Sequence, residues 1–195
     1  GSGSDTLKFI YTVQFGDESL DLDYISNIAL QLNGSTIKDS NGGDVDLTLP
    51  NPGDIDSLGV NKDIVIDTIS PTVTLNSTAT ATVNSKFSVT AQFSEAVNNF
   101  DINDISLNNS TVDNFNGSGN NYTFDVTPTN TGTVTVDINS AVAQDNALND
   151  NSQATQLTRE ADLTLPTVTQ ITASNSIISD SVTSFTLTVE YSEEM

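Results

Sequence analysis

Residues 87–95 read FSVTAQFSE, with an apolar side chain at every second position from 87 to 93. This alternation is typical of a β-strand that buries one face and exposes the other. A closely similar stretch, FTLTVEYSE, returns at residues 185–193, which is 98 positions further along the chain. We therefore expect the same strand to occur in two copies of one structural unit.

Three further correspondences surround this strand and keep its order. The first pairs DTISPTVT at 67–74 with DLTLPTVT at 162–169. The second pairs GSG at 1–3 and TLKFIYTV at 6–13 with GSG at 117–119 and NYTFDVT at 121–127. The third pairs DSNGGD at 39–44 with DNALND at 145–150. Their order predicts the latter half of one unit at 1–67, a complete unit at 68–162 and the first strands of a third at 163–195. Because a half sandwich leaves its core exposed, we expect its remaining strands to come from a longer repeat array or from another chain.

Short β-patterned runs between turn residues predict an all-β fold of tandem antiparallel β-sandwiches. The predicted strands are 72–76, 87–93, 105–107, 121–127, 133–138, 154–158 and 185–191, and, in the first part of the chain, 6–13, 28–32, 45–49 and 63–66. Residues 19–28 suit either a helical turn or an extended edge segment.

The composition excludes several classes of function. The 195 residues include 5 basic and 26 acidic side chains, for a formal charge of −21, and no cysteine, histidine or tryptophan. Such a chain has no basic patch for nucleic acid or an anionic membrane, and it has no thiol nucleophile, catalytic histidine or ordinary zinc site. It contains no apolar run of membrane-spanning length. The remaining donors are oxygens, which calcium prefers.

Several motifs together carry a family resemblance. PTVTL at 71–75, FSVTAQFSEAV at 87–97, AQDNALND at 143–150 and READ at 159–162 are similar to the bacterial Ig-like repeats of very large surface adhesins, over all of the middle unit. The first 67 residues resemble the latter half of a sister repeat. This resemblance implies tandem Ig-like β-sandwiches in an extracellular cell-surface protein, used as spacer or adhesive modules, often stiffened by calcium and rarely catalytic.

Acidic residues are predicted to gather where one sandwich joins the next. In an Ig-type sandwich the second strand returns to the pole at which the linker enters. This places Glu95 and the loop after it beside Asp67. The loop at 144–151 lies at the same pole if the strand before it also ends there. The carboxylates available at this pole as calcium ligands are those of Asp67, Glu95, Asp101, Asp104, Asp145 and Asp150. The corresponding candidate ligands in the neighbouring units are Asp39, Asp44, Asp162 and Glu193. The alternative is that Asp and Asn only form turns, since no loop has EF-hand spacing.

Two other chemistries have weaker support. The paired carboxylates Asp21 and Asp23, or Glu193 and Glu194, are compatible with a glycosidase acid and base, but pairs on strands usually form a solvated face, so we expect no enzyme. A Lys–Asn isopeptide bond at Lys8, Lys38, Lys62 or Lys86 would need a buried lysine, asparagine and carboxylate together, which the sequence does not indicate.

These observations predict a non-catalytic spacer or stalk segment of a large exported adhesin, stiffened by calcium, whose partners are the neighbouring repeats of the same chain. Two alternatives remain open. One is a subunit of a self-assembling extracellular filament, sheath or appendage, with the repeats packed into a homo-oligomer. The other is an accessory Ig-like module of a secreted polysaccharide-degrading enzyme.

Overall fold

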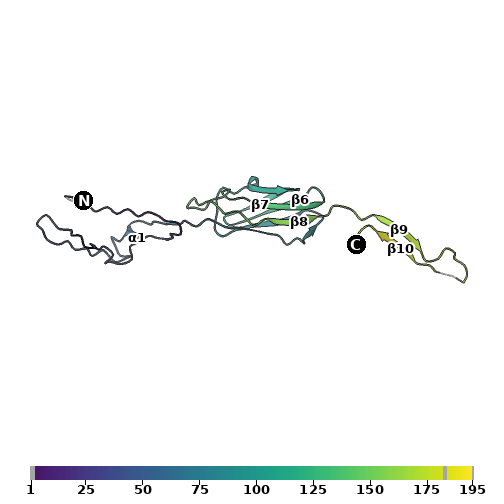
Figure 1. The fold of residues 1–195 in the computed structure, drawn as a ribbon, viewed down its shortest axis with the longest axis horizontal. Coiled ribbons are helices and arrows are strands. Elements are labelled where there is room, and N and C mark those ends of the chain that lie inside the picture. Colours follow the sequence, from purple (N-terminus) through teal and green to yellow (C-terminus); the bar gives the residue numbers. More distant parts are fainter. Residues whose placement is uncertain (1–2, 182–183, 195) are drawn as a thin grey trace.

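A β-sandwich occupies the centre of the molecule, and less regular segments extend from both of its ends. The computed structural model describes residues 3–181 and 184–194. Figure 1 shows the N-terminal segment, the sandwich and a C-terminal hairpin following one another along the long axis. The helix α1 (Leu58–Asn61) has four residues, and no helix in the described part of the chain is long and apolar enough to cross a membrane.

The sandwich consists of two four-stranded sheets. The first has the order β1 (Val73–Asn76), β3 (Phe87–Phe93), β6 (Asn121–Pro128), β5 (Ser110–Ser118). The second has the order β2 (Thr82–Val83), β8 (Leu157–Ala161), β7 (Gly132–Ile138), β4 (Ile105–Asn108), with a 3-10 turn η1 (Ile102–Asp104) before β4. Neighbouring strands are antiparallel except for β2 and β8. The predicted all-β fold is therefore confirmed.

The core is formed by alternate side chains of the central strands. On β3, Val89 and Ala91 are fully buried, and on β6 Phe124 and Val126 are at most 1 % exposed. Val89 lies opposite Phe124 in the β3–β6 ladder. Burial of one such side chain stabilises the fold by about 1.5–3 kcal/mol, so the period-two pattern that predicted these strands also accounts for their stability.

Aromatic rings close the pole of the sandwich at which the chain enters. Phe93, Phe100 and Tyr122 contact one another edge to face, with ring centroids 5.0–5.9 Å apart. The Tyr122 hydroxyl donates a hydrogen bond to the Val97 carbonyl oxygen over 3.3 Å. These contacts fix the loop after β3 against the end of the core.

Two strands of the sandwich were not predicted, and a third is displaced. β2 has only two residues. Most side chains of β5 are polar, and a bulge between Asp113 and Asn116 interrupts its pairing with β6. β5 also approaches β6 closely at Gly117, where φ is +136° and a Cβ atom would lie 2.3 Å from the Asn121 carbonyl oxygen. The strand predicted at 154–158 begins at Leu157.

The N-terminal segment forms no extended ladder. No strand is assigned at the predicted positions 6–13, 28–32, 45–49 and 63–66, and of these residues only Ile66 takes part in an isolated bridge, with Ser19. Many of their apolar side chains face solvent, including Phe9, which is 75 % exposed. The predicted strands in this segment are thus not formed, because the described residues supply no sheet on which they could pair.

Beyond the sandwich, the chain makes a hairpin of β9 (Val168–Ala173) and β10 (Leu187–Tyr191). The two strands are antiparallel, with Val189 opposite Ile171 and a bulge between Glu190 and Tyr191. Every residue of both strands is exposed. The hairpin therefore has the strand pairing of a sandwich without the second sheet that would cover it.

The difference in burial predicts unequal effects for the same substitution. Phe124→Ala is expected to lower the free energy of unfolding by about 3–5 kcal/mol, because it empties a site between the sheets. Phe9→Ala removes an exposed ring and is expected to change that free energy by less than about 0.5 kcal/mol. Urea denaturation of both variants in dilute solution measures the difference, and equal losses would contradict an exposed Phe9.

Candidate metal centre at the entrance to the sandwich

Three carboxylates from separate segments meet where the chain enters the sandwich. Asp67 lies in the segment before β1, Glu95 follows β3, and Asp145 begins the tight part of the loop between β7 and β8. A carboxylate oxygen of each lies within 4.8 Å of an oxygen of the other two. These are three of the residues that the sequence predicted for this pole.

Local hydrogen bonds hold Asp67 and Glu95 at this position. The Ile69 amide donates to Oδ1 of Asp67 over 3.0 Å, which fixes the linker in a turn. Ser94 joins the end of β3 to the start of β1, since its amide donates to the Thr72 carbonyl and its Oγ accepts from the Thr72 amide. Glu95, the next residue, is thereby brought beside the linker.

Asp145 is held by the loop that it begins. It is 1 % exposed, and its Oδ1 accepts hydrogen bonds from the amides of Ala147 and Asn149 over 2.8 and 2.9 Å. The Asn149 side chain donates to Oδ2 of Asp145 and also to the Asp67 carbonyl oxygen, over 2.8 and 3.2 Å. Asn149 thus connects the loop to the linker, and the carboxylate of Asp145 is preorganised before any ligand binds.

The cluster carries unbalanced negative charge. Burial raises the pKa of Glu95 above its usual value, and the nearby charges of Asp145, Asp67 and Glu18 raise it further. The ion pairs found in the described ranges use only Lys38 and Lys86, which pair with other carboxylates. No basic side chain there neutralises this pole.

Glu18 comes from the N-terminal segment, so the cluster faces a neighbouring unit. A groove at this junction is lined by Glu18, Ser19 and Leu20 on one side, and by Asp67, Ser94 and Glu95 on the other. Glu18 and Asn149 were not predicted from the sequence. Glu18 is one of many acidic residues. The bridge between Ser19 and Ile66 and the hydrogen bonds of Thr68 with Gly16 and Asp17 place it at the junction.

The donor set matches a hard divalent cation. Calcium takes 6–8 oxygen ligands, and its carboxylate ligands bind through one or both oxygens at about 2.3–2.6 Å. Asp67, Glu95 and Asp145 supply carboxylates, Glu18 lies nearby, and water can complete the shell. The absence of nitrogen and sulfur donors favours calcium over zinc or copper.

The other residues predicted for this pole have local roles. Asp101 and Asp104 cap η1 reciprocally, because the carboxylate of each accepts a backbone hydrogen bond of that turn. Asp150 accepts a hydrogen bond from the Gln144 side chain over 2.9 Å. These three lie outside the three-carboxylate cluster, and their contacts are those expected of turn formers.

The loop at 39–44 reproduces the geometry of the Asp145 loop. Oδ1 of Asp39 accepts from the amides of Asn41 and Gly43, at the same spacing at which Asp145 accepts from Ala147 and Asn149. Bridges join Lys38 with Asp44 and Gln144 with Asp150 in the same way. Asp39 is therefore the structural counterpart of Asp145.

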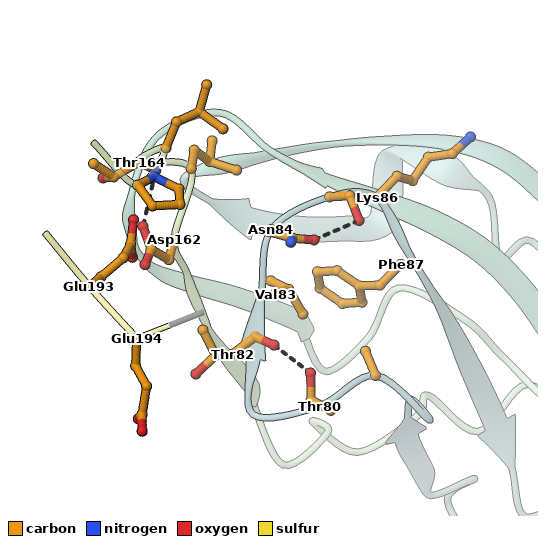
Figure 2. Close-up of a pocket in the computed structure, with 15 residues that line it drawn as sticks. Thr80, Thr82, Val83, Asn84, Lys86, Phe87, Asp162, Thr164, Glu193 and Glu194 are labelled. Carbon is orange, nitrogen blue, oxygen red and sulfur yellow. Dashed lines mark hydrogen bonds between the residues drawn. The ribbon is translucent and has the colours of Figure 1, made fainter. Parts of the chain in front are cut away.

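The linker and hairpin after the sandwich reproduce the entrance. The Thr164 amide donates to Oδ1 of Asp162 over 3.0 Å, as Ile69 does to Asp67, and Ser192 bonds to Thr167 as Ser94 does to Thr72. Asp162 and Glu193 line the same pocket (Figure 2). Oε1 of Glu193 is buried and has no hydrogen-bond partner. This pair is the counterpart of Asp67 and Glu95.

The lysine that comes nearest to an isopeptide arrangement is Lys86. Its Nζ lies 3.2 Å from Oδ2 of Asp125, to which the Asn114 side chain donates over 2.9 Å. The Lys86 side chain is 45 % exposed, and its pairing with Asp125 raises the pKa of the amine. A solvated, charged amine does not attack an amide, so this cluster acts as a surface ion pair.

Comparison with known proteins gives one match. Residues 67–161 match a family model described as a bacterial Ig-like domain. No curated protein and no solved structure matches the chain. The matched segment begins at Asp67 and includes Glu95 and Asp145.

The raised pKa of Glu95 predicts how the empty cluster responds to pH. A folded pKa above the unfolded value gives a stabilising contribution at low pH that is lost as the pH rises through the folded pKa. In the presence of chelator, Glu95→Gln is therefore expected to raise the melting temperature at pH 7, and the gain should shrink as the pH falls towards 4. Melting curves across this range measure the effect.

Glu190→Gln provides the control, because Glu190 is exposed on β10 and lies outside the cluster. It should leave the pH profile of the parent protein unchanged. A lower melting temperature for Glu95→Gln at pH 7 in chelator would contradict charge repulsion at this site.

Proposed function

We propose, from the premise that residues 67–161 are a bacterial Ig-like domain, that this chain is a spacer segment of a large extracellular adhesin whose joints are stiffened by calcium. Domains of this kind are generally structural and non-catalytic, and they are often parts of extracellular proteins. The observation that carries the proposal is the cluster of Asp67, Glu95 and Asp145 at the entrance to the domain, with Glu18 of the preceding segment beside it.

A cation at this position would change the mechanics of the joint. Without it, Glu18 repels the three carboxylates of the domain, so the charge opposes close contact between the segments. A divalent cation shared between them converts the repulsion into attraction. The linker then loses its freedom to bend, and a string of domains becomes a rod.

Calcium is expected to stabilise the domain by mass action. A hundredfold excess of calcium over its Kd should add about 2.7 kcal/mol to the free energy of unfolding. Glu95→Gln should remove most of this gain, whereas Asp113→Asn, which changes an exposed carboxylate on β5, should retain it. Melting curves in calcium and in chelator, together with titration calorimetry, measure the gain. Absence of binding heat in the parent protein would refute the calcium site.

A variant that changes the orientation of the N-terminal segment, but not the thermal stability of the sandwich, tests the joint itself. Glu18→Gln is expected to weaken the effect of calcium on the orientation of the N-terminal segment while leaving most of the thermal stabilisation of the sandwich. Small-angle X-ray scattering should show a longer and narrower distance distribution in calcium than in chelator for the parent protein, and a smaller difference for this variant. Asp56→Asn is the matched control, since this exposed carboxylate of the same segment does not line the groove.

A further inference from the structure

Three asparagines of the chain stand directly before a glycine, namely Asn33, Asn41 and Asn116. Asparagine is a chemically labile residue, and its side-chain carbonyl carbon is open to attack by the backbone nitrogen of the next residue. Glycine is the next residue that hinders this attack least, because it has no side chain. The three pairs lie in different structural settings, and the setting decides how readily each pair reacts.

Asn116 is held by the sandwich. It lies on β5 opposite Thr123, and Gly117 lies opposite Tyr122 in the ladder with β6. The Asn116 carbonyl oxygen also accepts a hydrogen bond from Oγ1 of Thr123 over 3.5 Å. Attack by the Gly117 nitrogen requires the backbone between the two residues to rotate, and this rotation would first have to open the ladder locally.

Asn41 is held by the loop that Asp39 begins. Oδ1 of Asp39 accepts hydrogen bonds from the amides of Asn41 and Gly43 over 2.8 and 2.7 Å. The Gly42 amide, which is the group that would attack, donates to the Asp39 carbonyl oxygen over 3.1 Å. This hydrogen bond has to break before the Gly42 nitrogen can react.

Asn33 lies in a less restrained turn. Asn33 and Gly34 have φ values of +46° and +89°, and a hydrogen bond of 2.9 Å from the Ser35 amide to the Leu32 carbonyl oxygen closes the turn around them. The turn is local, since this bond joins residues three positions apart. Both central residues are exposed, and neither forms a hydrogen bond to another described residue. No strand is assigned on either side of the turn, so it opens at low cost in free energy.

We propose that Asn33 is a site of spontaneous deamidation. The Gly34 nitrogen loses its proton to hydroxide and forms a bond to the side-chain carbonyl carbon of Asn33. The bond from this carbon to the side-chain nitrogen breaks, and the nitrogen takes a proton from water and leaves as ammonia. Water then opens the cyclic succinimide at one of its two carbonyl groups. The product is aspartate or isoaspartate, in which the main chain runs through the former side chain.

The modification changes the charge and the shape of the turn. Either product adds one carboxylate to a chain with 26 acidic and 5 basic side chains. Isoaspartate also adds a methylene group to the main chain between Leu32 and Ser35, which displaces the hydrogen bond that closes the turn. The turn lies outside the sandwich and outside the cluster of Asp67, Glu95 and Asp145, so this inference is independent of the proposed function.

Peptide mapping by mass spectrometry tests the site on the full chain. The folded protein is incubated in mildly alkaline buffer, and conversion to aspartate and isoaspartate is followed at each of the three asparagines. Asn33 is expected to convert at least about threefold faster than Asn41 and Asn116, because its turn is the least restrained of the three settings. Equal conversion at the three sites, or faster conversion at Asn41 or Asn116, would overturn the proposal.

Unfolding provides the control for sequence effects. In urea the three Asn–Gly pairs lose their structural restraints, so they should convert at similar rates. If Asn33 leads by the same factor in urea as in the folded protein, the difference comes from neighbouring residues and the structural argument is wrong. Conversion of Asn33 in urea but not in the folded protein would overturn the proposal, since the turn would then not open.

The matched variant is Asn33→Gly. It removes the reactive side chain, and glycine suits the positive φ of this position. The variant should lack the early conversion product of this segment and keep the melting temperature of the parent sandwich. An early isoaspartate signal of unchanged size in Asn33→Gly would show that another residue is the modified one.

Discussion

A strand with one apolar face needs at least one neighbouring strand and a second sheet over that face, and this requirement governs the described chain. In the sandwich, β3 meets it, because β1 and β6 pair with its edges and the side chains of β7 complete the core. The hairpin meets only half of it, and residues 6–13 do not meet it at all. The distribution of buried and exposed apolar side chains along the molecule follows from this difference.

Electrostatics imposes a second constraint on the ends of each unit. With 26 acidic and 5 basic residues, the chain cannot neutralise its own carboxylates, and the ion pairs of the described residues use Lys38 and Lys86 away from the entrance cluster. Positioning Asp67, Glu95 and Asp145 together therefore costs free energy in the absence of a cation. The hydrogen bonds of Asn149, Ser94 and the Asp145 loop offset that cost, and they keep the ligands in place.

Sequence reasoning succeeded where the signal was local or repeated. The alternation at 87–93 predicted β3, and the return path of that strand in a sandwich predicted that Glu95 would meet Asp67. β5 was missed because its side chains are largely polar and a bulge interrupts their alternation. Asp101 and Asp104 cannot be told from ligands by sequence, since their use in capping η1 depends on the turn that they form. Glu18 was missed because tertiary contacts, the bridge from Ser19 to Ile66 and the hydrogen bonds of Thr68 with Gly16 and Asp17, bring it to the junction.

The entrance to the sandwich and the segments that flank the sandwich carry one type of carboxylate arrangement. A linker carboxylate, a strand-end carboxylate and a loop carboxylate meet at the entrance to the sandwich. The same three types recur as Asp162, Glu193 and Asp39 in the flanking segments. Monovalent salt screens such clusters over about 8–10 Å but does not bridge them, whereas a divalent ion coordinates ligands from both sides. Under the proposed function, divalent ion concentration therefore sets the stiffness of each joint through this type of contact.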